Sequence, residues 1–489
     1  MELLAPAGNV DKLKYCYTYG ADAAYIGLKN FSLRIKADNF YEDEYKKVVE
    51  LKKAFPQKRL HCALNIAFHN DEIDRLLSEI DYFKMYPIDA FIVQDLGIVP
   101  ILQKHFPDAE LHLSTQASCL NREAVKMYKS LGFKRVVMGR EASLKEIAQI
   151  KDAVPDMEIE CFVHGAMCIA YSGRCLMSAY LNGRSAQSGF CSHTCRWDYD
   201  LLLDADVLKD PKKLAQSGAL SLKEYKRPDE LFPVYEGDNF TAILSSKDLC
   251  MIDHLADFKK AGVDSLKIEG RMKSIYYVAM ITRAYRKALD ALDKKISSEE
   301  AQPFVDELYK VSHRPFTTAF YYDRARADET ASGASDSPYQ LSAEFGRQLS
   351  LQEESEILEK ASLAQKKRQK EYDALVPQAK AAYDLRVQKM PDKYLPYAKK
   401  VDGFKMYFLT AMNMIDQNSQ LEVVSPDIVS IKVTREHYFL INPESGELYN
   451  WVCDGHPCVF YTDLPVANGS ILRCRDENYI EGKFRDTGR

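Results

Sequence analysis

Residues 60–93, LHCALNIAFHNDEIDRLLSEIDYFKMYPIDAFIV, contain the pattern that decides the fold: an apolar run, an amphipathic stretch and a second apolar run. Leu60–Ile66 and Ala90–Val93 are short and bounded by polar turns, which is typical of buried strands. Between them, Asp71–Met85 has apolar residues at helical spacing. A strand, a crossover helix and another strand predict two parallel neighbours in one sheet.

This unit repeats through the first 270 or so residues. The predicted strands are Glu2–Ala5, Ala24–Gly27, Leu60–Ile66, Ala90–Val93, Leu111–Leu113, Arg135–Met138, Ile159–Val163 and Ser265–Ile268. The predicted helices include Glu42–Phe55, Asp71–Met85, Asn121–Leu131, Leu144–Asp152 and a closing helix, Ile275–Leu292, capped by Ser274. Eight strands favour an α/β fold, a TIM-barrel-like (β/α)₈ catalytic domain. Ala242–Leu244 is a possible ninth strand, and an open doubly wound sheet is the alternative.

Composition changes along the chain predict three regions. Residues 1–322 form the barrel-type domain, with a cysteine-rich insertion at 165–197. Residues 323–400 read as a linker and a helical insertion, in which 350–390 form one or two solvated helices broken near Pro377. Residues 401–489 contain short β-prone runs between turns, which predicts a small β-barrel-like domain.

The composition is that of a soluble globular protein, with 46% hydrophobic and 28% charged residues. The formal net charge of -5 indicates that any contact with nucleic acid depends on a local basic surface. The first residues lack the features of a secretory signal, and no apolar run is long enough for a membrane span. A cytoplasmic location is therefore expected.

Four of the twelve cysteines gather in residues 165–197, GAMCIAYSGRCLMSAYLNGRSAQSGFCSHTCRW. They are Cys168, Cys175, Cys191 and Cys195. Structural zinc sites usually have two tight cysteine pairs, whereas iron–sulfur clusters tolerate looser spacing. Only the second pair is tight, so the spacing favours a [4Fe–4S] cluster over zinc, a disulfide or unligated thiols.

The same run contains Arg174, Arg184 and Arg196 and no acidic residue. A cluster held by four thiolates is negatively charged, and nearby cations would stabilise it. The arginines could equally hold a phosphate or a carboxylate of a ligand.

A second polar group follows the last predicted barrel strand. Alternation places Lys267 and Glu269 on one strand face, followed by Arg271. If that face is the barrel lumen, a lysine–glutamate pair is costly unless it has a function, although a structural ion pair is the alternative. His164 lies at the end of the seventh strand, where barrel enzymes carry their chemistry. The sequence contains no zinc-protease, serine-hydrolase or P-loop motif.

Several motifs together resemble peptidase family U-32, a collagenase-like family. They are MELLAPAGN, GADAAYIGLKNFSLR, FIVQDLG, LHLSTQAS, ECFVHGAMCIAYSGRCLMS, FCSHTCRWDY, SSKDL, SLKIEGRMKSIYYVAMITRAYRKALD and SHRPFTTAFYYD. The match spans about residues 1–322, and the 350–390 stretch and the tail depart from it.

The resemblance implies a barrel-type catalytic domain and a cysteine-ligated iron–sulfur cluster on Cys168, Cys175, Cys191 and Cys195. Some relatives take the fourth ligand from further downstream, which would be Cys250 here. The pattern is most similar to members that hydroxylate carbon 5 of the wobble uridine in tRNA, with prephenate as the linked metabolite.

Three functions remain open on this basis. The leading hypothesis is an RNA-modifying hydroxylase, in which Arg174, Arg184 and Arg196 contact phosphate or carboxylate, and Lys267, Glu269 and Arg271 line a small-molecule pocket. The alternatives are a peptidase, supported by the family label alone, and a non-catalytic cluster-bearing partner of another family member. The sequence leaves the oligomeric state open.

Overall fold

The computed structural model describes residues 1–28, 31–32, 40–41, 43–168, 170–182, 186, 191–196, 221–224, 227–233, 235–236, 241–242, 246–322, 337–380, 400–416 and 418–476. The chain divides into two compact units with the boundary after Ser337. No helix in these ranges is both long and apolar enough to cross a membrane.

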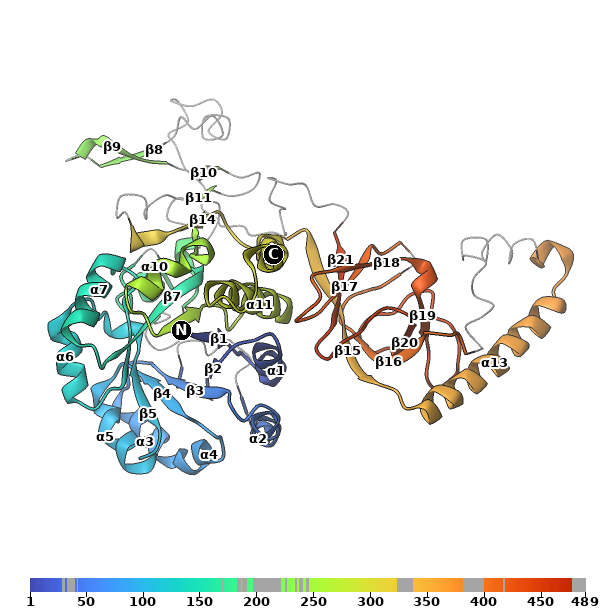
Figure 1. Ribbon diagram of the computed structural model, residues 1–489, viewed down its shortest axis with the longest axis horizontal. Helices are drawn as coiled ribbons and strands as arrows, with labels where there is room; N and C mark the ends of the chain where they lie inside the picture. Colours follow the sequence, from blue (N-terminus) through green and yellow to red (C-terminus); the bar gives the residue numbers. More distant parts are fainter. Residues whose placement is uncertain are drawn as a thin grey trace. The chain divides into compact units, whose positions relative to one another are not determined.

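Eight parallel strands close into a barrel in the first unit (Figure 1). They are β1 (Glu2–Pro6), β2 (Ala23–Ile26), β3 (Arg59–Leu64), β4 (Ala90–Val93), β5 (Glu110–Leu113), β6 (Arg135–Val137), β7 (Glu158–Ala166) and β13 (Ser265–Ile268). Pairing of β13 with both β1 and β7 closes the ring. The predicted barrel is therefore confirmed strand by strand, and the open-sheet alternative is wrong.

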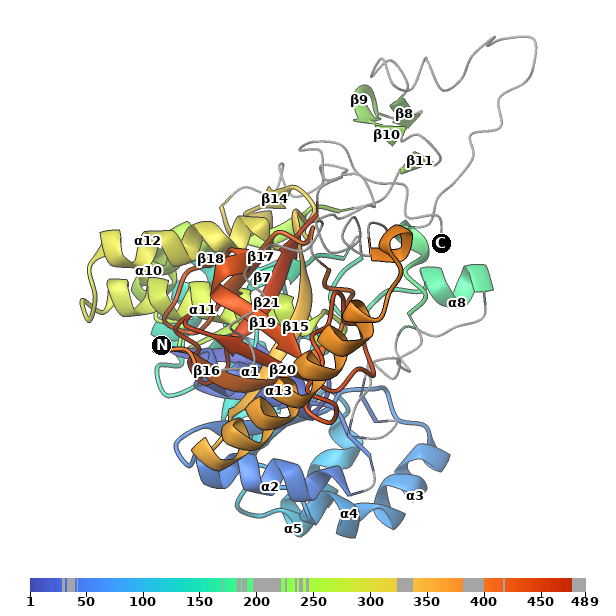
Figure 2. The same cartoon turned by 90° about the vertical axis from the view of Figure 1, so that its right-hand side faces the viewer.

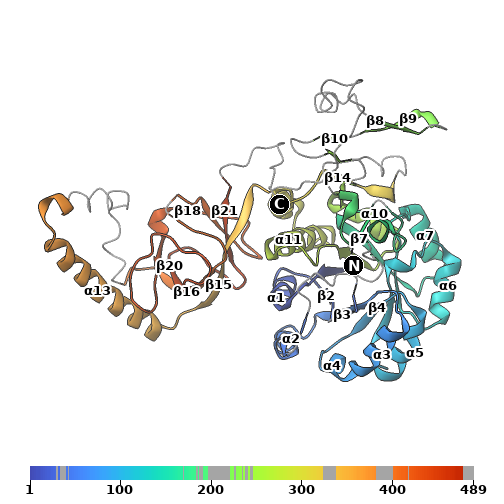
Figure 3. The same cartoon turned by 180° about the vertical axis from the view of Figure 1, so that it is seen from behind.

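Helices cover the outside of the barrel, as the view from behind shows (Figure 3). They are α1 (Val10–Thr18), α2 (Glu44–Ala54), α3 (Asn70–Ser78), α4 (Ile80–Lys84), α5 (Val99–His105), α6 (Arg122–Ser130), α7 (Leu144–Ala153), α10 (Leu255–Lys260), α11 (Ile275–Leu292) and α12 (Ser298–Asp306). The Ser274 hydroxyl accepts a hydrogen bond from the backbone N–H of Tyr277, so the predicted cap of α11 is confirmed. The stretch Asp71–Met85, expected as one helix, is broken between α3 and α4 near Glu79.

A long insertion separates β7 from α10. Its described elements are α8 (Met177–Asn182), the 3₁₀ turn η3 (Thr194–Arg196), β8 (Ser221–Glu224), β9 (Arg227–Pro233), β10 (Tyr235–Glu236), β11 (Thr241–Ala242) and β12 (Asp248–Cys250). Strand β12 runs antiparallel to the end of β7, and β14 (Phe316–Thr317) pairs with β12. Of the possible ninth strand, Ala242 belongs to β11, which pairs with β10, and residues 243–244 lie outside the described residues.

The second unit is built on a seven-stranded antiparallel sheet. In chain order its strands are β15 (Tyr339–Gln348), β16 (Lys405–Ala411), β17 (Leu421–Val424), β18 (Ile431–Val433), β19 (Tyr438–Ile441), β20 (Cys458–Thr462) and β21 (Ile471–Arg475). Helix α13 (Leu351–Asp373), drawn in orange in front of these strands in Figure 2, packs on the sheet with the half that contains Ile357 and Ala361.

Helix α13 lies in the region predicted as solvated helices broken near Pro377; it ends before that proline and is mostly exposed, but one stripe of it is buried. Ile357 and Ala361 are buried and pack in one core cluster with Met406, Phe439 and Val459 of the sheet. Most of the helix surface is polar. The apolar stripe through which the helix packs on the sheet is narrow, so the sequence pattern did not indicate it. The region predicted as a linker therefore contributes β15 and α13 to the β-rich unit.

Candidate functional site

The carboxyl ends of the barrel strands carry the cysteine-rich insertion. Strand β7 continues past the barrel to Ala166, and Cys168 follows two residues later. Gly165, in this extension, has φ of 107°, and a Cβ there would lie 2.8 Å from the carbonyl oxygen of Glu269. Glycine is therefore required where the insertion leaves the barrel.

The segment before Cys175 is held to the ends of β5 and β6. The hydroxyl of Ser118 donates to the carbonyl of Ser172, and the backbone N–H of Ser172 donates to Glu141 Oε1 at 2.7 Å. The backbone N–H of Arg140 in turn donates to Ser172 Oγ at 3.3 Å. Side chains from two strand ends thus fix the position of one loop residue.

Gly173 makes this docking tight. Its φ is 75°, and a Cβ would lie 2.0 Å from the carbonyl oxygen of Gln116. The neighbouring Arg174 donates from Nε to Ser118 Oγ at 3.3 Å. This predicted arginine is accordingly a loop-to-barrel contact in the structure.

The four cysteines of the insertion differ from the thiols of the barrel wall. Cys168 is exposed, and Cys175, Cys191 and Cys195 are partly exposed, with none in a disulfide. By contrast, burial raises the pKa of Cys119 to about 11. Accessible thiols suit a metal centre better than buried, protonated ones.

Two of these sulfurs have polar neighbours. Arg140 Nη1 lies 3.9 Å from Cys168 Sγ, and Ser178 Oγ lies 3.8 Å from Cys191 Sγ. The donor chemistry fits an iron–sulfur centre, because none of the four thiols is in a disulfide and a cation lies beside one of them. Within the described ranges, however, no three His, Cys, Asp or Glu side chains form a ligand group.

Cys250, the alternative fourth ligand, is on β12 in register with His164. Burial raises the pKa of its thiol to about 11, and its Sγ lies 3.9 Å from the hydroxyl of Tyr285. Among the predicted arginines, Arg184 lies outside the described residues. Arg196 closes η3, and its side chain also lies outside the description.

Arg140 is a further cation at this site; its place at the end of the sixth predicted strand indicated a functional position, but it was not among the predicted site residues. Its guanidinium lies 4.2 Å from the centre of the Phe162 ring, in addition to its contact with Cys168. On β13, the ammonium of Lys267 is 5.6 Å from the centre of the same ring. The motif Gly139-Arg140-Glu141 directly follows β6, and that position was the only signal that could have identified it.

Lys267 pairs with a residue other than the predicted one. Its Nζ donates to Glu160 Oε1 at 2.7 Å, and both side chains are buried. Glu269 lies beyond the end of β13, where its backbone N–H donates to the carbonyl of His164. The Lys267–Glu269 pair is therefore corrected to Lys267–Glu160, because β13 ends before Glu269 could face the lumen.

Part of the barrel core consists of charged side chains that form a network around Arg135. Arg135 lies 2.5 Å from Glu2, 2.8 Å from Glu158 and 3.0 Å from Glu160. Burial alone would raise the pKa of Glu160, but the charges of Lys267 and Arg135 outweigh it and lower this pKa to about 2. Glu160 is consequently ionised, and it forms an ion pair with the buried Lys267.

Arg271 and His164 have different surroundings. Arg271 is buried and donates from Nη1 to Ser32 Oγ at 3.1 Å. His164 packs against the rings of Tyr285 and Phe316, and burial lowers its pKa to about 3. His164 is therefore neutral in this environment, and its assignment as a candidate catalytic residue stays a prediction.

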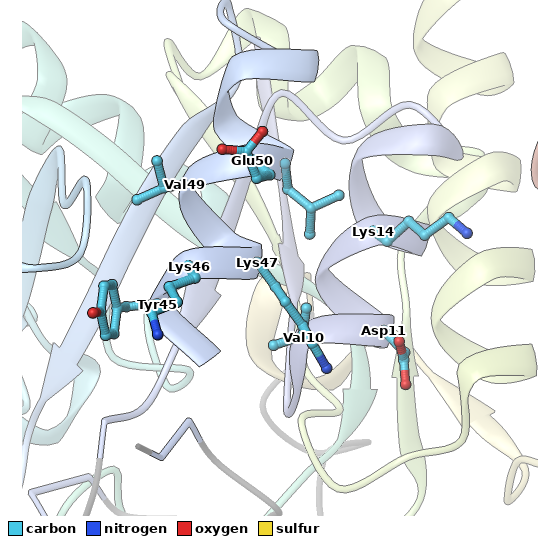
Figure 4. A pocket seen from close by; sticks show the side chains of 9 residues that line it. Val10, Asp11, Lys14, Tyr45, Lys46, Lys47, Val49 and Glu50 are labelled. Atoms are coloured by element: carbon cyan, nitrogen blue, oxygen red, sulfur yellow. The ribbon is translucent and has the colours of Figure 1, made fainter. Parts of the chain in front are cut away.

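A separate hollow of about 620 Å³ opens between α1 and α2 on the helical layer (Figure 4). Its lining residues include Val10, Val49 and Leu51 together with Lys14 and Glu50. This mixture of apolar and oppositely charged groups identifies no particular ligand. We therefore place the candidate site at the strand ends.

Several curated proteins are similar to this chain in sequence. The tRNA hydroxylation protein P of Escherichia coli is 37% identical over 337 residues, covering 65% of this chain and 74% of that protein. The tRNA hydroxylation protein P1 of Bacillus subtilis is 40% identical over 321 residues, covering 65% and 70%. The 23S rRNA 5-hydroxycytidine C2501 synthase of Escherichia coli is 35% identical, covering 69% and 47%.

A solved structure, that of the U32 peptidase Mk0906, matches 55% of this chain and 93% of its own at 12% identity, with a TM-score of 0.33. The family model Peptidase family U32 matches residues 8–331, which include the barrel strands from β2 to β13 and the cysteine-rich insertion. The chain therefore belongs to peptidase family U32.

Proposed function

We propose that this chain is an iron–sulfur-dependent enzyme that hydroxylates carbon 5 of the wobble uridine in tRNA, with prephenate as the linked metabolite. The observation that carries the proposal is the docking of the cysteine-bearing segment onto the ends of β5 and β6 through Ser118, Glu141 and Ser172. This places Cys168 beside Arg140 at the face where barrel enzymes react. The names of the relatives supply the reaction class.

Cys168, Cys175, Cys191 and Cys195 would hold a [4Fe–4S] cluster, with Cys250 as the alternative fourth ligand. Such a cluster would supply electron transfer at the barrel mouth. The proposal requires the loop to draw the four sulfurs together on binding, because the described residues contain no assembled ligand group. Metal sites commonly form in this way, with binding free energy ordering the ligands.

Lys267 and Arg271 are proposed to bind the carboxylates of prephenate. Lys267 comes from β13 and lies 4.6 Å from the centre of the Tyr25 ring, and Arg271 lies 6.0 Å from the same centre. Two cations converging on one aromatic ring suit an anionic small molecule that carries an apolar ring. Glu160 would orient Lys267, and Ser32 would orient Arg271.

The RNA would present its base unstacked, since sequence-specific recognition usually targets single-stranded loops. A net charge of -5 means that phosphate contacts depend on local cations. Arg174 and the predicted Arg184 and Arg196 are proposed for this role, because they belong to the loop above the strand ends.

The test is nucleoside mass spectrometry of total tRNA from a strain that lacks the gene. We expect 5-hydroxyuridine-type nucleosides to disappear, and to return with the wild-type gene but not with Cys168→Ser or Lys267→Met. Cys474→Ser is the matched control, because this thiol is in the second unit, on β21. Cells unable to make prephenate should show the same loss. Unchanged nucleosides in the deletion strain would refute the proposal.

Two measurements separate the alternatives. Gelatin cleavage by the iron-loaded protein, abolished by a single substitution, would favour a peptidase. Constant co-purification with a second family member, and no modification without it, would favour a non-catalytic partner.

A further inference from the structure

A cysteine and a histidine lie in contact on a turn of the β-rich unit. Cys453 Sγ lies 3.3 Å from Nδ1 of His456, and a turn joins the two residues, because the backbone N–H of His456 donates to the carbonyl of Cys453. Gly455, inside the turn, has φ of 83°. The turn thus brings a thiol and an imidazole together on one short loop.

A third soft donor lies on the neighbouring segment. Ile415 and Val452 exchange two backbone hydrogen bonds, of 2.8 and 2.9 Å, in an antiparallel bridge, and both side chains are fully buried. Since side chains alternate across a strand, the next pair along, Met414 and Cys453, belongs to the opposite face. Met414 is 62% exposed, which agrees with that placement.

Cys453 and His456 contact each other and the backbone of their turn, and none of the three donors belongs to the buried core of the unit. Cys453 is only partly buried and forms no disulfide, so it contributes little to the core. The side chain of Met414 is mostly exposed, so it buries less than half of its apolar area. Trp451, on the same face by alternation, is 49% exposed, and its ring centre lies 4.9 Å from that of His456.

We propose that Met414, Cys453 and His456 form a binding site for a soft monovalent cation, Cu(I). Thiolate and thioether sulfurs select Cu(I) over hard cations, and imidazole nitrogen is compatible with it. Binding replaces the thiol proton of Cys453, which goes to solvent, and leaves the oxidation state of copper unchanged. Ligation through Nδ1 of His456 leaves the ring proton on Nε2. The site is independent of the proposed hydroxylation.

Trp451 provides a direct readout. The chain contains two tryptophans, Trp197 and Trp451, so Trp197→Phe leaves one fluorophore beside the site. We expect anaerobic titration of this full-length protein with Cu(I), buffered by a competing chelator, to quench Trp451 with saturation at one ion per chain. Mg²⁺ should have no effect.

Matched variants test each ligand. Cys453→Ser and His456→Gln should each weaken the affinity measured by the quench by more than about tenfold, and Met414→Leu should weaken it measurably. Cys474→Ser removes a thiol from the same unit and should change nothing. Circular dichroism and thermal unfolding of every variant exclude misfolding as the cause of a loss. Quenching that survives Cys453→Ser, or no quenching at all, would overturn the proposal.

Discussion

Arg140 contacts both parts of the candidate site, the barrel strands and the cysteine-rich insertion. Its guanidinium contacts the Phe162 ring and Cys168 Sγ, while its backbone N–H holds Ser172. A fixed positive charge beside a ligand sulfur stabilises the more negative state of a cluster. Arg140 should therefore affect a bound cluster without being one of its ligands.

Replacing Arg140 by Gln should make the reduction potential of the iron-loaded protein more negative, because the reduced cluster loses a neighbouring cation. Arg140→Lys should shift it less. An anaerobic redox titration followed by visible absorption measures the shift. Arg122→Gln removes an arginine whose side chain is 61% exposed on α6, and should leave the potential unchanged. Equal potentials for Arg140→Gln and Arg122→Gln would rule out the role of Arg140, whereas an iron-free wild type would instead refute the cofactor.

The burial of His61 leads to a prediction about how stability depends on pH. It is fully buried on β3, its ring lies 4.8 Å from that of His112, and neither of its ring nitrogens has a hydrogen-bond partner in the described structure. Burial, followed by the nearby His112, lowers the pKa of His61 well below its usual range. The folded state therefore keeps His61 neutral while the unfolded chain takes up a proton below about pH 6.5.

The sign of the pH effect follows from this difference in protonation. Because the unfolded state binds more protons, stability falls as pH is lowered from about 6.5, and His61 alone contributes a loss of about 2 kcal/mol by pH 5. His61→Phe should remove that part of the loss. Urea unfolding of the wild type and the variant at pH 7 and pH 5 measures it. An identical loss in both proteins would contradict the assignment.

Candidate site residues could be predicted from the sequence where they cluster or follow a strand. The residues that they contact in the folded protein could not. The four cysteines and Lys267 stand out by spacing and by strand position. The partner of Lys267 is Glu160, which is 107 positions away and is set by the register of β13 against β7. Alternation along one strand predicts a face, but only the closed barrel determines which strand supplies the opposite charge.

At the scale of elements, the connection between the insertion and the barrel depends on Gly173. A Cβ there would lie 2.0 Å from the backbone of Gln116, and the positive φ disfavours any other residue. Gly173→Ala should displace the segment that leads to Cys175, and should lower the iron content per chain while leaving barrel unfolding nearly unchanged. Iron and sulfide analysis with thermal unfolding measures both quantities.

Gly403→Ala is the control for this substitution. Its φ is 83°, yet nothing lies within 4 Å of the added Cβ, so only backbone strain is introduced. Iron content should therefore stay at the wild-type level. If Gly173→Ala also keeps the wild-type iron content, the docking of this segment is not required for cluster binding.

Helices and strands could be predicted from the sequence where their apolar residues form a continuous run or recur at regular spacing. The eight barrel strands and α11 follow continuous apolar runs or a capped periodic segment. Helix α13 was assigned to solvent because its buried stripe includes few apolar residues, among them Ile357 and Ala361. That stripe packs against β16, β19 and β20, which follow much later in the chain. The local sequence of the helix therefore does not show that it has a partner.

At the scale of the whole molecule, the chain is two folding units with separate cores. Every ladder of the seven-stranded sheet lies within residues 339–475. Its core is centred on Phe460, which is fully buried between the rings of Tyr438 and Phe345, at 4.9 and 5.3 Å. A unit with its own core and complete strand pairing is expected to fold alone.

A fragment of residues 338–479 should therefore show one cooperative unfolding transition in urea, followed by near-ultraviolet circular dichroism of its packed aromatic rings. Phe460→Ala removes the central ring and should cost about 3–5 kcal/mol in that transition, because the cavity cannot fully collapse. In the full-length protein the same substitution should shift only the transition of the β-rich unit, while the barrel transition keeps its midpoint. A gradual, non-cooperative loss of signal in the fragment, or an equal shift of both transitions in the full-length variant, would show that the two units fold as one.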